Sequence, residues 1–210
     1  MRKKWIIVVS VIGAILLGTV LAGPVMSVVE KPKYKIITAE KNIEVRLYSP
    51  MIIAATQITD NRKEAISKGF RLLADYIFGN NIVQKNIAMT APVQQQSSQK
   101  IPMTAPVQQQ STGHSWTISF VMPSKYTMES LPKPNDKRVT LKEIPSQKFV
   151  VIRFSGLNSD ANIKKHEKRL KYYINTHKLA VTGSPKYAFY NPPWTLPFMR
   201  RNEVMIEIKQ

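Results

Sequence analysis

Lys68 and Arg71 are the pair of basic side chains best spaced to act together on a ligand. They lie three residues apart within a stretch with helical apolar spacing, so they would share one helix face. Two cations one turn apart can meet carboxylates together through charge-assisted hydrogen bonds. The same pair is also compatible with a solvated basic helix face that has no binding role.

A second group of residues lies late in the chain, in a segment that is unusually apolar for a loop. Residues 194–199 read WTLPFM, with Trp194 and Phe198 as the aromatic members, and Arg200 and Arg201 follow directly. This segment either covers one end of a sheet or forms one wall of a ligand site. The arginines can pair with carboxylates of a ligand or with carboxylates of the protein itself.

Several kinds of catalytic and metal chemistry have no support in the sequence. The chain has no cysteine, which excludes disulfides, thiol catalysis and zinc sites that need cysteine. Of the three histidines, His166 and His177 would lie about 16 Å apart along a helix and cannot ligate one iron together. His114 falls in a polar loop. No GxGxxG, phosphate-loop, HExxH or nucleophile-elbow string appears, so the sequence offers no motif for nucleotide-phosphate binding, zinc-protease chemistry or serine-hydrolase chemistry.

The charge balance is strongly basic. The 210 residues include 31 Lys and Arg against 13 Asp and Glu, a formal net charge of +18. Such an excess suits nucleic acid, an anionic membrane surface or an acidic small ligand. Here the basic residues are spread along the chain without a long basic run, so we expect no nucleic-acid partner.

The N-terminus resembles a targeting or anchoring segment. Three basic residues precede residues 5–29, which contain no charged side chain. As a helix this stretch would reach about 37 Å, enough to cross a bilayer core of about 30 Å. A cleaved signal peptide and an uncleaved signal anchor both remain open. We therefore predict a signal segment at 1–30, a membrane partner through residues 5–29, and a domain at 33–210 outside the cytoplasm or exported after cleavage.

Hydrophobic periodicity predicts the elements of this domain. Helical spacing predicts two helices, at 61–78 with a cap at Asp60 or Asn61, and at 160–177 with a cap at Ser159 or Asp160. Alternation and β-branched residues predict strands at 43–47, 51–58, 116–122, 139–144, 148–154, 187–190 and 203–208. The first two strands and the pair at 139–154 each surround a proline turn.

An internal repeat and a longer duplication are also visible. MTAPVQQQS occurs at 89–97 and at 103–111, which predicts two similar strands ending near their prolines and joined by a polar Gln/Ser loop. The order strand, proline turn, strand, helix, strand, strand occurs in 43–108 and again from about 139 to 208. Pro50 and Pro145 lie 95 residues apart. A duplicated α+β unit follows, whose antiparallel strands close or nearly close into a barrel with two helices outside.

Several long strings closely resemble the SOUL haem-binding family. They run in order through the soluble part: IAMTAPV at 87–93, FVMPSKY at 120–126, LPKPND at 131–136, RFSG at 153–156, YNPPW at 190–194 and RRNEV at 200–204. The resemblance implies a distorted antiparallel β-barrel of two pseudo-symmetric halves, each with one α-helix. It also implies non-enzymatic binding of haem or another tetrapyrrole.

By this resemblance, the tetrapyrrole site uses the exposed face of the first helix and the nearby late loop. The residues that this assigns are Lys68, Arg71, Trp194, Phe198, Arg200 and Arg201. The axial histidine of some relatives does not carry over, because the early part of this chain has no histidine. Two alternatives stay open. One is a pocket for hydrophobic cations or amphiphiles, like that of drug-binding regulatory domains of the same architecture, and the other is an enzyme that modifies a tetrapyrrole.

Overall fold

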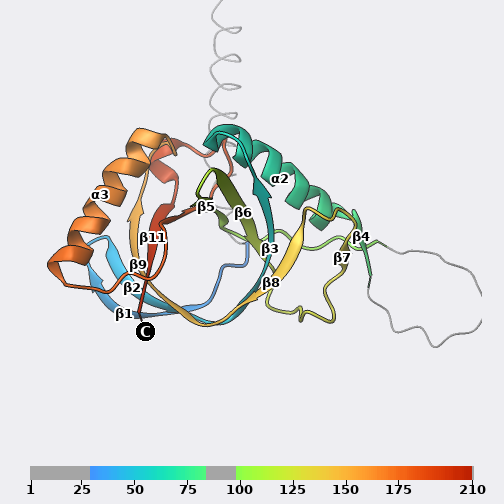
Figure 1. The fold of residues 1–210 in the computed structure, drawn as a ribbon, viewed down its shortest axis with the longest axis horizontal. Coiled ribbons are helices and arrows are strands. Elements are labelled where there is room, and N and C mark those ends of the chain that lie inside the picture. The colour runs from blue at the N-terminus through green and yellow to red at the C-terminus, as the bar shows by residue number, and fades with distance from the viewer. Residues whose placement is uncertain (1–28, 84–97, 210) are drawn as a thin grey trace, which may run out of the picture.

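Nine strands form one strongly curled antiparallel sheet, and two helices pack on its outer face (Figure 1). The computed structural model describes residues 29–83 and 98–209. The strands follow one another across the sheet in the order β1 (Tyr34–Glu40), β2 (Ile43–Tyr48), β9 (Gln147–Phe154), β11 (Asn202–Ile208), β10 (Lys186–Phe189), β5 (Val107–Thr112), β6 (Ser115–Val121), β3 (Met51–Ile58) and β8 (Thr140–Ile144). A separate pair joins β4 (Asn81–Ile82) to β7 (Lys133–Pro134).

The predicted N-terminal segment at 1–30 lies almost wholly outside the described residues, and so does the first copy of the repeat at 89–97. Within 29–83 and 98–209, no helix combines the length and the hydropathy that a membrane span needs.

Both predicted helices are confirmed. Helix α2 spans Arg62–Phe78, and its N-cap Asn61 accepts a hydrogen bond from the backbone N–H of Glu64. Helix α3 spans Asp160–Thr176, and Ser159 caps it in the same way. In each helix the side-chain oxygen of the cap satisfies one of the amide groups that the first turn leaves free. Helix α2 follows β3 and helix α3 follows β9, both of which have a neighbour on each side in the sheet, and the equal length of the two helices agrees with a duplicated unit.

The proline turns do not close hairpins. Strand β2 pairs with β1 and β9, whereas β3 pairs with β6 and β8. The chain therefore crosses from one half of the sheet to the other at Ser49–Pro50, and crosses back at Pro145–Ser146 between β8 and β9. As a result the first strand of each sequence unit, β2 or β8, pairs within the half of the sheet that the other unit forms.

The sheet does not close into the expected barrel. Strands β1 and β8 are its two ends, and the outcome is a strongly curled half-barrel. Strand β1 was not predicted from the sequence, because its side chains are almost all exposed and both Ile36 and Ile37 are about half exposed. The register also shifts between Ile36 and Thr38, which breaks the alternation that marks a strand.

The polar Gln/Ser stretch of the second repeat is a strand and not a loop, which corrects the sequence-based prediction. Strand β5 begins after Pro106 and continues through all three glutamines to Thr112. Gln109 is only 2% exposed, on the helix side of the sheet, where its amide oxygen accepts a hydrogen bond from Arg62. Gln108 and Gln110 line the inner face. A polar strand is stable here because both of its faces offer polar partners.

Two apolar clusters attach the helices to the outer face of the sheet. Helix α3 packs on β2, β9 and β11, and α2 packs on β3 and β6. Helix α2 lies close to the sheet at Gly69, where an added Cβ would stand 2.9 Å from Ile118 Cβ. A third cluster, which includes Tyr48, Phe149 and Met205, covers part of the inner face.

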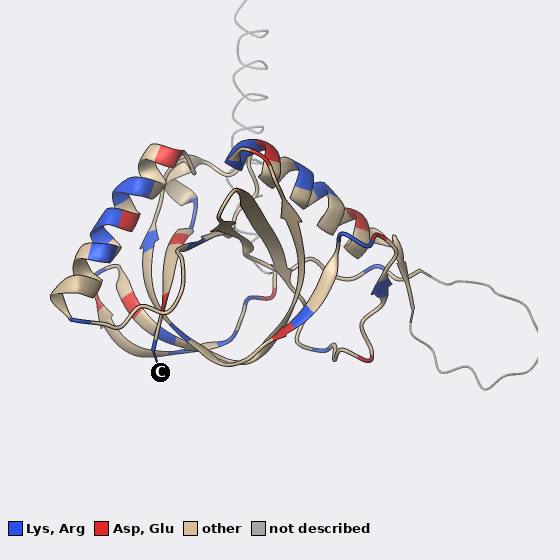
Figure 2. Cartoon of the chain, in the orientation of Figure 1, with Lys and Arg blue, Asp and Glu red and all other residues tan. Residues whose placement is uncertain are grey.

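Basic side chains are distributed over the whole molecule. Figure 2 shows Lys and Arg along both helices and on several strands, with Asp and Glu interspersed. This agrees with the spread of charge along the sequence and differs from the single basic face expected of a nucleic-acid surface.

Candidate functional site

The loop between β10 and β11 is held in place by its own arginine. The Arg200 guanidinium donates to the backbone carbonyls of Thr195 and Pro193. Further along the loop, the carbonyl of Pro197 accepts from the backbone N–H of Gly156, in the connection that leads to α3. The loop therefore has a defined shape and lies beside the start of α3 (Figure 1).

Five apolar side chains on and beside this loop remain exposed. We call this surface the rim: Leu157, Trp194, Leu196, Phe198 and Met199. Trp194 is 66% and Phe198 74% exposed, so these rings do not cover an end of the sheet. Of the two sequence-based interpretations, exposure favours the ligand wall, because exposed apolar side chains gathered in one place mark interaction sites.

Lys68 and Arg71 lie on the exposed face of α2, as the helical spacing predicted. Lys68 Nζ is 2.7 Å from a carboxylate oxygen of Asp60, and this hydrogen bond raises the pKa of Lys68 and lowers that of Asp60. Arg71 follows one turn later and is exposed. Lys68 is about half exposed, so its ammonium can exchange Asp60 for another carboxylate at small cost.

Arg62, which sequence analysis missed, joins the two helices. Its guanidinium donates to Asp160 Oδ1 at 2.7 Å and to the Gln109 amide at 3.2 Å, and it lies about 6 Å from the Tyr187 and Phe189 rings. Arg62 and Asp160 are the first residues of α2 and α3, so equivalent positions of the duplicated unit carry opposite charges that pair. This contact brings the N-termini of both helices together near the rim.

Arg201 has a structural role. Its guanidinium donates to Glu203 Oε1 at 2.7 Å and lies 4.1 Å from the centre of the Tyr190 ring. Glu203 is fully buried and also accepts hydrogen bonds from Arg46 at 3.0 Å and from Tyr190 at 2.8 Å. Burial, followed by the nearby charge of Glu203, raises the pKa of the Tyr190 hydroxyl, so this group stays protonated and donates.

The histidines do not lie at the rim. His166 is buried, stacks on Phe154 with centroids 4.0 Å apart, and has its Nδ1 2.8 Å from the Asn162 carbonyl. His177 stacks on Tyr173 at the end of α3. His114 is exposed in the turn between β5 and β6. Among the described residues, no group of His, Asp and Glu is arranged to hold a metal ion.

A cavity of about 470 Å³ occupies the inner, concave face of the sheet; we call it the inner cavity. Apolar side chains of its wall include Met51, Ile53, Phe149 and Met205. Its charged lining residues are Lys142 and Lys186. Neither lysine was identified by sequence analysis as a site residue.

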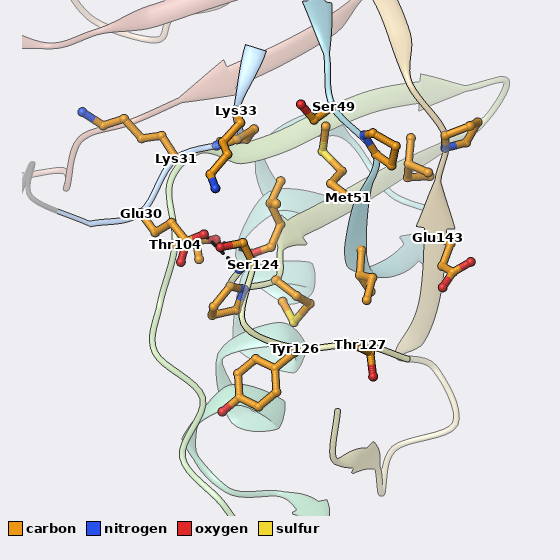
Figure 3. A pocket seen from close by; sticks show the side chains of 18 residues that line it. Glu30, Lys31, Lys33, Ser49, Met51, Thr104, Ser124, Tyr126, Thr127 and Glu143 are labelled. Carbon is orange, nitrogen blue, oxygen red and sulfur yellow. Dashed lines mark hydrogen bonds between the residues drawn. The ribbon is translucent and has the colours of Figure 1, made fainter. Parts of the chain in front are cut away.

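A second cavity, of about 600 Å³, lies where the two proline turns meet residues 30–33 (Figure 3). Its charged lining residues have both signs: Glu30, Lys31, Lys33 and Glu143. The Glu30 carboxylate accepts a hydrogen bond from the backbone N–H of Ser124, so it helps to fix the chain here. This arrangement indicates a structural junction more than a selective site.

Comparison with solved structures shows the same fold at low sequence identity. The C-terminal domain of EcmrR aligns with a TM-score of 0.56 and 8% identity, covering 84% of this chain and 98% of that domain. A protein from Listeria innocua described as a hydrolase aligns at 0.51 with 16% identity, covering 82% and 94%. An uncharacterized conserved protein from the same organism aligns at 0.52 with 11% identity and the same coverage. Identities this low establish the architecture alone.

A comparison with curated protein sequences finds no match. A family model does match: it is described as SOUL heme-binding protein and covers residues 29–207, which include both helices, the sheet and the rim. The chain therefore belongs to the SOUL haem-binding family.

Proposed function

We propose that this protein binds haem or a related tetrapyrrole without transforming it, and that the rim together with the exposed face of α2 forms the site. Membership in a haem-binding family supports the ligand class. The observation that carries the location is the exposure of the Trp194 and Phe198 rings beside the meeting point of the two helices.

The residues present fit a tetrapyrrole. A macrocycle needs apolar contacts, and the exposed side chains of Trp194, Phe198 and Leu157 can supply them. Its propionates need cations, and the exposed Lys68 and Arg71 supply them. Arg201 is engaged by Glu203, and Arg200 by carbonyls of its own loop, so Arg200 is the next candidate after the α2 pair. Bound haem would supply a redox-active iron.

A charge reversal on α2 tests the site. The full chain, in a neutral detergent, is titrated with haem while the absorption band is followed. Changing both Lys68→Glu and Arg71→Glu is expected to weaken binding more than tenfold, because each charge-assisted bond contributes about 1.5–3 kcal/mol and tenfold requires about 1.4 kcal/mol. Folding should persist, because both residues lie off the buried face of α2.

The matched control makes the same change of net charge on α3. Lys165→Glu with Lys168→Glu alters two exposed lysines that are also three residues apart, and should leave haem affinity unchanged. Haem with esterified propionates should bind the parent and the α2 variant alike. If both double variants bind ordinary haem as the parent does, the proposed role of α2 is wrong.

Anchoring of the domain at a membrane surface, outside the cytoplasm, is a further part of the proposal. It rests on the uncharged stretch at 5–29 and on the basic residues before it. Alkaline extraction of membranes tests it: the full chain should stay with the lipid, and a chain that lacks residues 1–30 should be released. Release of both would contradict an anchor.

The alternative of a hydrophobic-cation pocket receives no support from the buried Glu203 or from the charged residues of the inner cavity. Such a ligand needs a free carboxylate beside aromatic rings. Glu203 is buried among tyrosines, but Arg46 and Arg201 already pair with it. The charged residues that line the inner cavity are lysines.

An enzymatic role is tested by following bound haem with a reductant present. The Listeria innocua protein described as a hydrolase has 16% identity with this chain, so its activity does not transfer. Protein-dependent loss of the porphyrin absorption band would contradict the proposal that the protein binds the tetrapyrrole without transforming it.

A further inference from the structure

The inner cavity lies on the face of the sheet opposite the helices, and both polar and apolar side chains line it. Strands β3, β5, β6, β8, β9, β10 and β11 all contribute lining residues. Its volume of about 470 Å³ lies in the range of small-molecule sites, roughly 300–1,000 Å³. Gln108 and Gln110 add amide groups to the apolar wall. The rim lies on the loop from β10 to β11 and, at Leu157, on the connection from β9 to α3, and it shares no residue with this lining.

Lys186 is a partly buried charged residue in the lining of the inner cavity. Its Nζ lies 4.9 Å from the centre of the Phe149 ring, and burial lowers the pKa of this lysine. Within the described part of the chain, no carboxylate lies within ion-pair distance of Lys186. Glu207 acts on Lys186 only from farther away and accepts a hydrogen bond from Gln147. A partly buried ammonium without a counterion favours an anion that supplies one.

Lys142 strengthens the preference for an anion. It lies on β8, across the cavity lining from β10, and is exposed. Both charged residues of the lining, Lys142 and Lys186, are therefore positive, and they would repel a cationic ligand. The methionines and Phe149 provide adaptable apolar contacts for a ring.

We propose that the inner cavity binds a small apolar carboxylate, with the carboxylate at Lys186 and an aromatic or short aliphatic body against Phe149 and Met205. This site is separate from the proposed tetrapyrrole site. It would let one domain carry two different ligands, one on each face of its sheet.

Methionine methyl groups report on the two sites separately. Met205 lines the inner cavity, and Met199 belongs to the rim. The full chain, labelled with [¹³C-methyl]methionine in a neutral detergent, is titrated with 2-naphthoate and with 2-naphthylmethylammonium, which share a ring system and differ in the sign of charge. We expect 2-naphthoate to shift the Met205 signal saturably and leave Met199 in place. The ammonium compound should leave Met205 unmoved.

A charge deletion sharpens the test. Lys186→Leu should weaken 2-naphthoate binding at least tenfold, since it removes the one partly buried cation of the site. Lys164→Leu, on the exposed face of α3, should change nothing. The charge-matched probes test the parent chain directly, so the proposal stays testable even if the Lys186 variant does not fold.

Three results would overturn the proposal: a Met205 signal that 2-naphthoate leaves unmoved at millimolar concentration, equal effects of the two probes on Met205, or equal 2-naphthoate affinity of a folded Lys186 variant and the parent. Porphyrin titration of the same sample should move Met199. The tetrapyrrole proposal and the carboxylate proposal can therefore fail independently.

Discussion

The two halves of the sheet use the same topology for different purposes on the inner face. When β3 of the first unit is matched with β9 of the second, their partner strands β6 and β11 match as well. Thr117 and Ser119 of β6 then occupy the positions of Glu203 and Met205 of β11. In the α3 half, Glu203 is the centre of a buried network with Arg46, Arg201 and Tyr190. In the α2 half, the equivalent small hydroxyl side chains leave space for the inner cavity. The inner face of the sheet is therefore filled by side chains in the α3 half and open in the α2 half.

The largest expected effect comes from breaking the filled half at Glu203. Glu203→Gln removes the counterion that Arg46 and Arg201 share, and Arg46, whose side chain is 1% exposed, keeps only its ion pair with Glu44. Breaking a buried ion pair costs about 3–5 kcal/mol, and because Glu44 still compensates part of the Arg46 charge, the free energy of unfolding should fall by about 3 kcal/mol in a urea titration. The matched change in the open half, Thr117→Val, removes one hydrogen bond to Thr112 and should cost about 1 kcal/mol. Equal effects at the two positions would contradict the contrast between the halves.

Helix packing offers a second contrast, because α2 depends on a glycine and α3 does not. Gly69→Ala should destabilise the protein by about 1–3 kcal/mol, since the new methyl group meets the Ile118 side chain at 2.9 Å and must displace helix or strand. Thermal unfolding measures the loss. Ser67→Ala on the exposed face of the same helix should be neutral or slightly stabilising, because alanine has the higher helix propensity. A Gly69→Ala protein as stable as its parent would show that α2 can move outward freely.

The smallest expected effect is a pH dependence that belongs to the α3 half. Burial lowers the pKa of His166, and the nearby Arg169 and Lys165 act in the same direction. The unfolded chain, with an ordinary histidine pKa of about 6.5, therefore binds a proton more readily than the folded chain. Stability is full above that value and declines as the pH falls from about 6.5 toward the lower pKa of the folded state. His166→Gln should flatten this decline in urea titrations at pH 7.5 and 5.5, whereas His114→Gln, in an exposed turn, should not.

Local patterns in the sequence predicted the two helices and many of the strands, whereas the order of the strands in the sheet depends on long-range pairing that such patterns do not show. The helices at 61–78 and 160–177 were predictable because their apolar spacing and their caps, Asn61 and Ser159, are local signals. The exchange of β2 and β8 between the halves was not predictable, because a proline turn does not reveal which strands pair beyond it. Strand β5 was missed because its glutamines are stabilised by Arg62 and by the inner cavity, which no local pattern shows.

For the candidate site, the sequence located the rim segment and the basic face of α2, but not the groups that organise them. One signal for the buried network was present: Arg46 and Glu203 are opposite charges that alternate with apolar residues in their strands, and a charge inside such a strand needs a partner if it is buried. Lys186 gave no such signal, since a lysine at the start of a short strand is typical of a solvent-exposed position. Its environment depends on Phe149, which comes from a distant strand.

The crossing of the chain at its two proline turns has a consequence for how the protein comes apart. A fragment that ends after β6 would hold β2 without its neighbour β9, and β3 without β8, so neither half could complete its sheet alone. We therefore expect the halves to unfold in a single cooperative transition despite their separate helices and apolar clusters. Two complementary fragments, cut in the β6–β8 connection, should stay disordered apart and regain structure only when they are mixed.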